Sequence, residues 1–230
     1  MKHLVYIVLF CCGSLSAQDK YGEIRKFVAV GNTSIAYRLL DSVGVVDKVT
    51  DSVLYYSALC ALHDNDWKKA KAFTTKLNKQ FTDFGETEFL IGMVHYIRED
   101  YGRCTEAFNR LLRKNPTHYK ALFNRAMAFG KAGNYNFAIE DLTAYIKLRP
   151  EDANAYYARA YWLEFMEQYK ESVADYEKAI QLHPKNFDAY IGLAFCWSKL
   201  NDRSKACEAI ERSIQEGSQI GTDLKNIYCR

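Results

Sequence analysis

One short pattern recurs along this chain at a fixed spacing, and that spacing constrains the fold more than any other feature of the sequence. The stretch GNYNFAIEDL at 133–142 returns in altered form as EDYGRCTEAF at 99–108 and as EQYKESVADY at 167–176. A fixed period of about 34 residues indicates stacked supersecondary units, none of which can bury its apolar face alone. We therefore predict a single elongated solenoid rather than two separate globular domains.

The register of the period divides the chain into units that we expect to be antiparallel helical hairpins. In the first helix of a unit, apolar residues recur three and four positions apart, as at Leu122, Ala126 and Phe129. The predicted segments are a degenerate N-terminal hairpin at 18–50, five full units at 51–84, 85–118, 119–152, 153–186 and 187–220, and a short C-terminal cap at 221–230. The cap is expected to be a short helix with Leu224 and Ile227 at core positions.

Residues of one kind recur at one phase of the period. The corner between the two helices carries turn-forming pairs, namely Asn65-Asp66, Gly133-Asn134 and Asn201-Asp202. All three prolines of the chain, Pro116, Pro150 and Pro184, fall at the phase where the second helix must end.

Two columns of small residues, at Ala126 and Ala138 and their equivalents, predict close approach of the two helices in each hairpin. A column of large rings follows each corner, at Trp67, Tyr101, Tyr135 and Tyr169, and we expect these rings to fill the space between successive hairpins.

The stretch YKALFNRAMAFGKAGNYNFAIEDLTAYIKLRPED at 119–152 resembles the tetratricopeptide repeat, a helix–turn–helix unit of about 34 residues. The resemblance covers roughly 51–220, although Arg125 and Arg159 replace the usual leucine and Arg203 replaces the usual aromatic residue. It implies an all-α, right-handed superhelical solenoid whose inner groove is formed mainly by the first helices. It also implies a non-catalytic scaffold or adaptor that binds another polypeptide.

The resemblance places two columns of first-helix residues on the concave surface. The predicted groove residues are Tyr55, Leu59, Phe89, Met93, Phe123, Asn124, Met127, Tyr157, Tyr161 and Phe195. Because nearly all of them are apolar or aromatic, we expect an apolar or amphipathic segment as the ligand. The alternatives are that some rings pack between hairpins, or that the groove is filled by the protein's own N-terminal segment or by a second copy. Only Asn124 matches the relatives that clamp a terminal carboxylate, so that mode is not expected.

The first residues, MKHLVYIVLFCCGSLSAQ, have the order of a secretory signal peptide: a basic start, a short apolar run and small residues. We predict cleavage after Ala17 and a location in the periplasm or outside the cell. Phe10 precedes Cys11, and Cys11 precedes Cys12, where a lipidated cysteine needs a small residue before it, so a lipid anchor is not expected. No later segment is apolar for the roughly 20 residues that a membrane-spanning helix needs.

Five cysteines follow the predicted cleavage point, and export would allow them to form disulfides. Cys196 and Cys207 flank the corner at 201–202 at similar distances, so an antiparallel hairpin should bring them to similar height. This spacing leaves two interpretations open: a disulfide between Cys196 and Cys207 as a hypothesis, or two small buried thiols in helix packing.

The sequence carries no pattern that indicates catalysis, a cofactor or a bound metal. Four histidines, at 63, 95, 118 and 183, fall at different phases of the period and should not converge. The net charge is +3 with basic and acidic residues mixed, so nucleic acid is not an expected partner. We predict a protein that is not an enzyme, needs no cofactor and binds another protein. The alternatives are a regulatory subunit of an envelope enzyme complex and a self-associating structural protein.

Overall fold

The computed structural model describes residues 22–46, 50–81 and 85–229, and in this part of the chain it contains thirteen α-helices and no strand. The predicted all-α class is confirmed, whereas the predicted signal peptide lies outside the described residues. The helices are α1 (Gly22–Ala29), α2 (Thr33–Val46), α3 (Asp51–His63), α4 (Trp67–Gln80), α5 (Thr87–Ile97), α6 (Tyr101–Lys114), α7 (Tyr119–Lys131), α8 (Tyr135–Leu148), α9 (Ala153–Phe165), α10 (Tyr169–Leu182), α11 (Phe187–Lys199), α12 (Arg203–Gln215) and α13 (Gln219–Tyr228).

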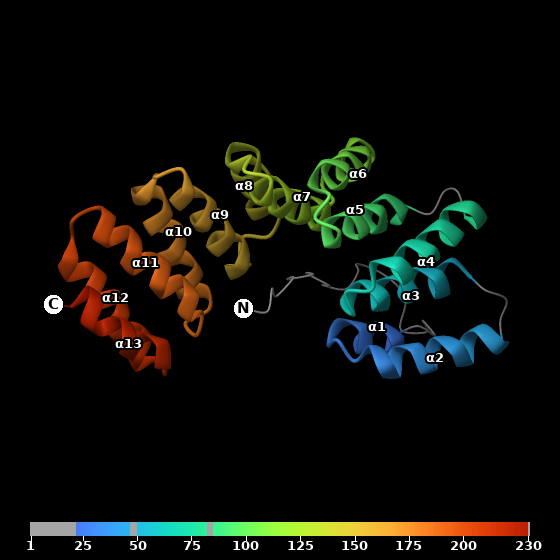
Figure 1. Ribbon diagram of the computed structural model, residues 1–230, viewed down its shortest axis with the longest axis horizontal. Helices are drawn as coiled ribbons and strands as arrows, with labels where there is room; N and C mark the ends of the chain where they lie inside the picture. The colour runs from blue at the N-terminus through green and yellow to red at the C-terminus, as the bar shows by residue number, and fades with distance from the viewer. Residues whose placement is uncertain (1–21, 47–49, 82–84, 230) are drawn as a thin grey trace. The chain divides into compact units, whose positions relative to one another are not determined.

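The helices pack in chain order as the hairpins of a repeat solenoid (Figure 1). The described residues divide into two compact units, one that ends at Asn124 and one that begins at Arg125, and the boundary between them falls within α7. In the first unit each helix from α1 to α6 packs on the next, and α3 also packs on α1 and α5. In the second unit the same order runs from α8 to α13, and α11 also packs on α9 and α13. Alternate helices therefore contact each other, as stacking of similar hairpins requires.

The corner between the two helices of a hairpin repeats its backbone conformation at one phase of the period. A residue just after the first helix has a positive φ at Asn65, Glu99, Gly133, Glu167 and Asn201, with values between 58° and 79°. This left-handed conformation ends the helix, because it lets the next amide nitrogens bond back to its last carbonyls. The prediction that these pairs form the corners is therefore confirmed.

Aspartates begin several of the second helices. Asp66, Asp100 and Asp202 each accept a hydrogen bond from the backbone nitrogen three residues later, at distances of 3.1–3.3 Å. Each bond satisfies one of the amide donors that the first turn of a helix leaves without a partner. With or without such an aspartate, the second helices from α2 to α12 start at one phase of the period, at Thr33, Trp67, Tyr101, Tyr135, Tyr169 and Arg203.

The two predicted small-residue columns lie in the core. Every member is buried, with 0% exposure at Ala36, Ala58, Ala70, Cys104, Ala126, Ala138, Ala160, Ser172, Ala194 and Ala206, and with Gly92 buried as well. At Gly92 an added Cβ would lie 2.7 Å from the ring of Phe108 on α6, so only glycine allows this ring to approach α5. The close helix approach predicted from these columns is confirmed.

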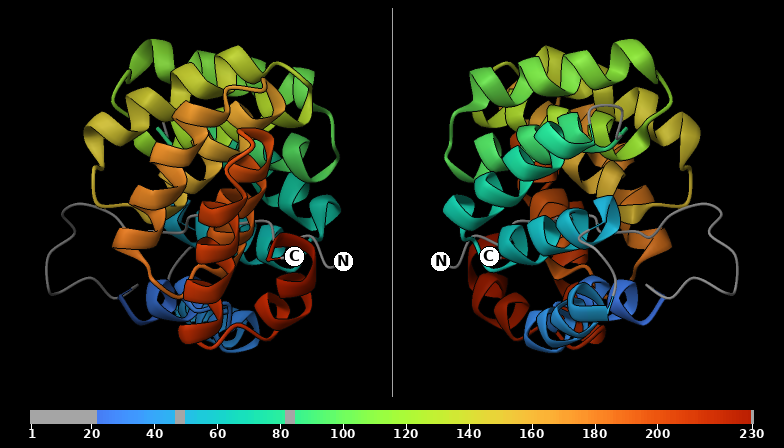
Figure 2. Two further views of the ribbon diagram at one scale, coloured as in Figure 1. Left: turned by 90° about the vertical axis from the view of Figure 1, so that its left-hand side faces the viewer. Right: turned by 90° about the vertical axis from the view of Figure 1, so that its right-hand side faces the viewer.

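The C-terminal helix α13 packs on α11 and α12; Figure 2 shows α12 and α13, coloured red, from two further sides. Leu224 packs against the apolar core of this end, as predicted, but Ile227 is 64% exposed and the prediction of a core position is wrong. Its face of α13 meets no further hairpin within the described residues. Across the same ranges, none of the helices combines the length and apolar character needed to cross a membrane.

The structure joins Cys207 on α12 to Cys229, just after α13, with a Cα–Cα distance of 4.7 Å. The predicted disulfide between Cys196 and Cys207 is therefore wrong. Cys196 is fully buried on α11, and its thiol donates a hydrogen bond to Oγ of Ser172 on α10 at 3.3 Å. The two side chains point to different neighbours, since Cys196 meets the preceding hairpin and Cys207 meets the C-terminal helix. The disulfide fastens that helix to the last full hairpin.

Candidate functional site: an aromatic patch on α9

Half of the predicted groove residues are inside the hairpins and cannot contact a ligand in this structure. Leu59, Phe89, Met93, Phe123 and Asn124 are each at most 4% exposed. The ring of Phe89, for example, lies between Phe108 and His118, with ring centroids 5.8 Å and 5.7 Å away. The sequence placed these residues on the correct helices but did not show how far the neighbouring hairpin covers them. We correct the predicted groove accordingly.

The other five predicted residues are at least partly accessible. Tyr55, Met127, Tyr157 and Phe195 are half-buried, and Tyr161 is 36% exposed. Tyr55 belongs to the first unit, where its ring contacts Tyr56. Phe195 contacts Tyr169, whose place between hairpins matches the prediction for the ring column. Tyr157 and Tyr161 both lie on α9, and their rings are in contact with each other.

Five rings of α8 and α9 form what we call the aromatic patch: Tyr135, Tyr157, Tyr161, Trp162 and Phe165. Tyr157, Tyr161 and Phe165 are spaced four positions apart and therefore share one face of α9. Their successive ring centroids are 6.4 Å and 5.0 Å apart. Tyr135 on α8 stacks on Phe165 at 5.2 Å. Phe165 is 50% exposed, which is unusual for a phenylalanine and makes the patch an accessible apolar surface.

Trp162 is the floor of the aromatic patch. It is 3% exposed, and its ring contacts Tyr161, Tyr135 and Phe165 with centroid distances of 4.8, 5.7 and 5.9 Å. The other side of the indole lies on Gly130 of α7, where an added Cβ would be 2.2 Å from the ring. The glycine lets the indole sit flush with the helix backbone. Trp162 in turn holds three rings of the patch in place.

Two buried ion pairs brace the helices around the aromatic patch. Arg159 on α9 binds Asp175 on α10 through two hydrogen bonds of 2.7 Å and also donates to Thr143 on α8. Arg125 on α7 binds Asp141 on α8 in the same bidentate way, at 2.7 and 2.6 Å. The bond to Asp175 raises the pKa of the Arg159 guanidinium above its ordinary value. The two arginines that depart from the repeat pattern therefore have specific partners.

The sequence contained a signal for these ion pairs. The aspartate follows the arginine at the same spacing in both places, and the two pairs lie one period apart. The unit that follows has Leu193 and Ala209 at the same two positions, and the unit at 85–118 has Ile91 and Ala107. Arginine and aspartate thus appear together or not at all. Comparing units position by position predicts the pairing, whereas comparing the arginines with the family pattern shows only a departure.

The aromatic patch is uncharged. Burial raises the pKa of the Tyr161 hydroxyl above its ordinary value, so this tyrosine stays protonated at neutral pH. On the α10 side of α9, the buried hydroxyl of Tyr176 donates to Oε2 of Glu164 at 2.9 Å, and burial raises the pKa of both groups. Because the rings of the aromatic patch are uncharged, the patch suits apolar and aromatic side chains rather than ions.

Two histidines among the residues that the structure describes lie beside a carboxylate. His95 lies 3.4 Å from Asp100 and His118 binds Glu86, each within its own hairpin or the next. One group has three ligand atoms close together, Cys207, Glu211 and Cys229, but the disulfide uses both sulfur atoms.

Comparison with known proteins agrees with the repeat. Two family models, both described as tetratricopeptide repeat, match residues 91–162 and 166–219. Together they span more than half of the chain, which is therefore a tetratricopeptide repeat protein. No curated protein sequence matches it. This architecture is that of a protein–protein interaction scaffold.

Solved structures show the same fold at low sequence identity. Residues 41 to the end of MamA from Desulfovibrio magneticus RS-1 align with a TM-score of 0.66 and 20% identity, covering 72% of this chain and 94% of that one. A MamA RS-1 double mutant gives 0.67 and 21%, with 72% and 93% covered. The Cut9–Hcn1 hetero-tetramer structure gives 0.75 and 11%, covering 92% of this chain and 42% of that chain. These likenesses establish the fold.

Proposed function

We propose that the protein is a non-catalytic scaffold that captures an apolar or amphipathic polypeptide segment on the aromatic patch. The observation that carries the proposal is the row of Tyr157, Tyr161 and Phe165 on α9, of which Phe165 is half exposed although it is apolar. Rings in such a row offer a large contact area at little cost in side-chain entropy. The buried Trp162 and the Arg159–Asp175 pair fix the row before a partner arrives, which lowers the cost of binding.

The partner segment is expected to be short and largely apolar. The five rings of the patch carry no charge, so they offer nothing to pair with an ionic group in the ligand. An amphipathic helix laid across α9 would place residues three and four apart against the rings, which is the common way in which helices fill apolar grooves. Two alternatives for the role of the same surface are regulation within an enzyme complex and self-association through the rings.

Loss of the outer rings should weaken capture of the partner. With Tyr161 and Phe165 both replaced by alanine, we expect partner binding to fall at least about tenfold, because burying one such ring is worth roughly 1.5–3 kcal/mol. Phe137 on α8 provides the matched control, since it is 54% exposed but touches Phe129 rather than the patch. A photo-reactive phenylalanine at position 161, introduced in the producing organism, should yield a covalent adduct, and the same group at position 137 should not.

The identity of the cross-linked partner also distinguishes between the alternative roles of the patch. An adduct of two copies of this chain would indicate self-association, and an adduct with an enzyme would indicate the regulatory role. Equal adducts from positions 161 and 137, or capture unchanged by the double replacement, would contradict the assignment of the patch as the binding surface.

We further propose that the protein works after export, in the periplasm or outside the cell. The apolar N-terminal run after Lys2 motivates this, and the Cys207–Cys229 disulfide supports it because disulfides persist mainly in oxidising compartments. The intact mass of the protein isolated from its organism should equal that of 18–230, and it should rise by about 2 Da on reduction as one disulfide takes up two hydrogens. A mass that still includes the segment before Gln18, or one unchanged by reductant, would contradict the proposal.

A further inference from the structure

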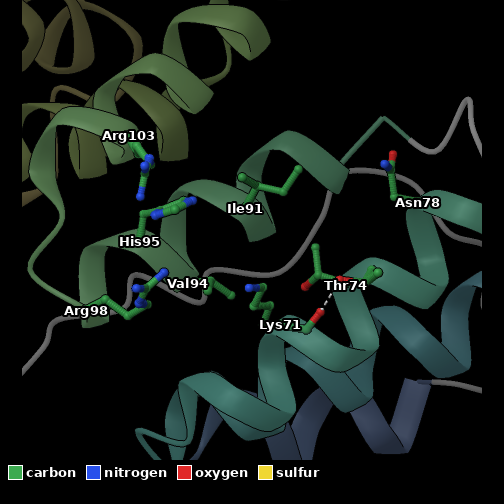
Figure 3. A pocket seen from close by; sticks show the side chains of 9 residues that line it. Lys71, Thr74, Asn78, Ile91, Val94, His95, Arg98 and Arg103 are labelled. Atoms are coloured by element: carbon green, nitrogen blue, oxygen red, sulfur yellow. Dashed lines mark hydrogen bonds between the residues drawn. The ribbon is translucent and has the colours of Figure 1, made fainter.

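A recess lies in the first unit, between α4 and α5, with a volume of about 360 Å³. Its lining comes from α4, α5 and the start of α6, and it includes Lys71, Ile91, Val94, His95, Arg98 and Arg103. Figure 3 shows these side chains around one open space, with Asn78 at one end and the cationic groups gathered at the other. We call this recess the α4–α5 pocket.

The cationic end of the α4–α5 pocket is built from α4, α5, the residue that follows α5 and the start of α6. Lys71, His95, Arg98 and Arg103 point their nitrogen atoms toward the same region (Figure 3). No aspartate or glutamate is among the lining residues. A carboxylate does lie close by, because Asp100 binds Arg103 at 3.2 Å and lies 3.4 Å from Nδ1 of His95. Asp100 therefore offsets the charge of Arg103 and leaves Lys71 and Arg98 as the uncompensated cations.

Neither Lys71 nor Arg98 forms an ion pair in the part of the chain that the structure describes. Arg98 lies over the ring of Trp67, 4.8 Å from its centroid, which fixes the position of the guanidinium without neutralising it. Burial lowers the pKa of His95 below its ordinary value, so at neutral pH the ring is a neutral hydrogen-bonding group. The pocket thus presents two positive charges and a neutral imidazole to a ligand.

The floor of the α4–α5 pocket is apolar. Val94 is buried and Ile91 is half-buried, whereas Lys71, Thr75 and Arg98 on the rim are exposed. The hydroxyl of Thr74 donates to the carbonyl of Ala70, so its proton already has a partner. An apolar floor below a cationic rim suits a ligand with both characters. Free phosphate would leave the floor empty, and a neutral hydrocarbon would leave the two cations without a partner.

We propose that the α4–α5 pocket binds a small organic anion with an apolar body and a single anionic head group, such as a medium-chain carboxylate. The apolar body lies on Ile91 and Val94, and the head group lies between Lys71 and Arg98. This site is separate from the aromatic patch, so its test does not depend on the proposed scaffold function.

Calorimetric titration of the purified chain with octanoate tests the proposal, with 1-octanol and inorganic phosphate as comparison ligands. Octanoate should bind, and each comparison ligand should bind at least about tenfold more weakly because it satisfies only one half of the pocket. Equal binding of octanol would show that the cations contribute nothing, and equal binding of phosphate would show that the apolar floor contributes nothing. Either result, or no binding of octanoate, would overturn the proposal.

Two substitutions on the rim test the geometry. Lys71→Gln should weaken octanoate binding about fivefold, as expected for removal of one partly exposed charge contact. Lys76→Gln removes the same charge from an exposed position on α4 outside the pocket and should change binding less than twofold. Thr75→Glu, also at an exposed position, places a carboxylate among the cations and should abolish binding. Equal effects of the two lysine substitutions, or unchanged binding to the Thr75 variant, would place the ligand elsewhere.

Discussion

Replacing Arg159 with leucine is expected to lower the free energy of unfolding by about 3 kcal/mol, because it leaves the Asp175 carboxylate without its partner. The Asp175 side chain is only 9% exposed and receives both of its short hydrogen bonds from this one guanidinium. Thr143 would lose its bond to Arg159 as well. Urea-induced unfolding followed by far-ultraviolet circular dichroism measures the loss.

The next unit supplies the control for this prediction. It carries Leu193 and Ala209 at the positions of Arg159 and Asp175, so the double variant R159L/D175A copies a combination that the same fold already contains. We expect its stability to return to within about 1 kcal/mol of the original, since no buried charge is left unpaired. If the double variant were no more stable than R159L, the loss would come from packing and not from the carboxylate.

A matched surface pair shows how much burial matters. Arg103 binds Asp100 at 3.2 Å, but the arginine side chain is 67% exposed. Removing an exposed partner of this kind usually changes stability by less than about 1 kcal/mol. The difference between the two pairs is therefore a difference in access to water, not in the type of bond.

The fold could be predicted from the sequence because each unit of the repeat has the same kind of residue at the same position. One alanine at position 126 says little, but a small residue at that phase in every full unit requires close helix packing, and the structure buries each of them. The corner residues behave in the same way, because Asn65, Gly133 and Asn201 share a left-handed backbone. A position that is misleading in one unit therefore matters little when all units are compared.

The binding surface did not follow as well, because a repeat pattern fixes the phase of a residue but not how deeply its neighbours cover it. Phe89 and Tyr157 occupy equivalent positions, yet Phe89 is 2% exposed and Tyr157 is half-buried. The difference comes from which residues lie beside them, with His118 and Phe108 around Phe89 and with Tyr161 and Tyr176 around Tyr157. Such cover depends on which side chains the same helix and its neighbours supply, and these side chains differ from one unit to the next.

The disulfide is a second feature that the repeat pattern did not determine. Spacing about the corner indicated that Cys196 and Cys207 lie at similar height, but it did not indicate which way each side chain points. Cys196 faces Ser172 in the preceding hairpin, and Cys207 faces the helix that follows. Cys229 lies beyond the last full repeat, where the period gives no equivalent position for comparison.

Replacing Gly130 with alanine should destabilise the second unit by about 2 kcal/mol, even though alanine normally favours a helix over glycine by about 1 kcal/mol. The added Cβ would lie 2.2 Å from the indole of Trp162, and this ring is rigid, buried and enclosed by other rings of the aromatic patch. Urea-induced unfolding measures the loss. Near-ultraviolet circular dichroism should report the changed surroundings of the indole.

Gly102 on α6 gives the matched control, because an added Cβ there meets nothing within 4 Å. Gly102→Ala should leave the protein as stable as before or slightly more stable. Displacement of Trp162 would also move Tyr161 and Phe165, so Gly130→Ala should weaken partner capture although residue 130 is not itself part of the patch. Unchanged stability of the Gly130 variant would show that the indole can move at no cost, and the rings above it would then not be fixed in advance of binding.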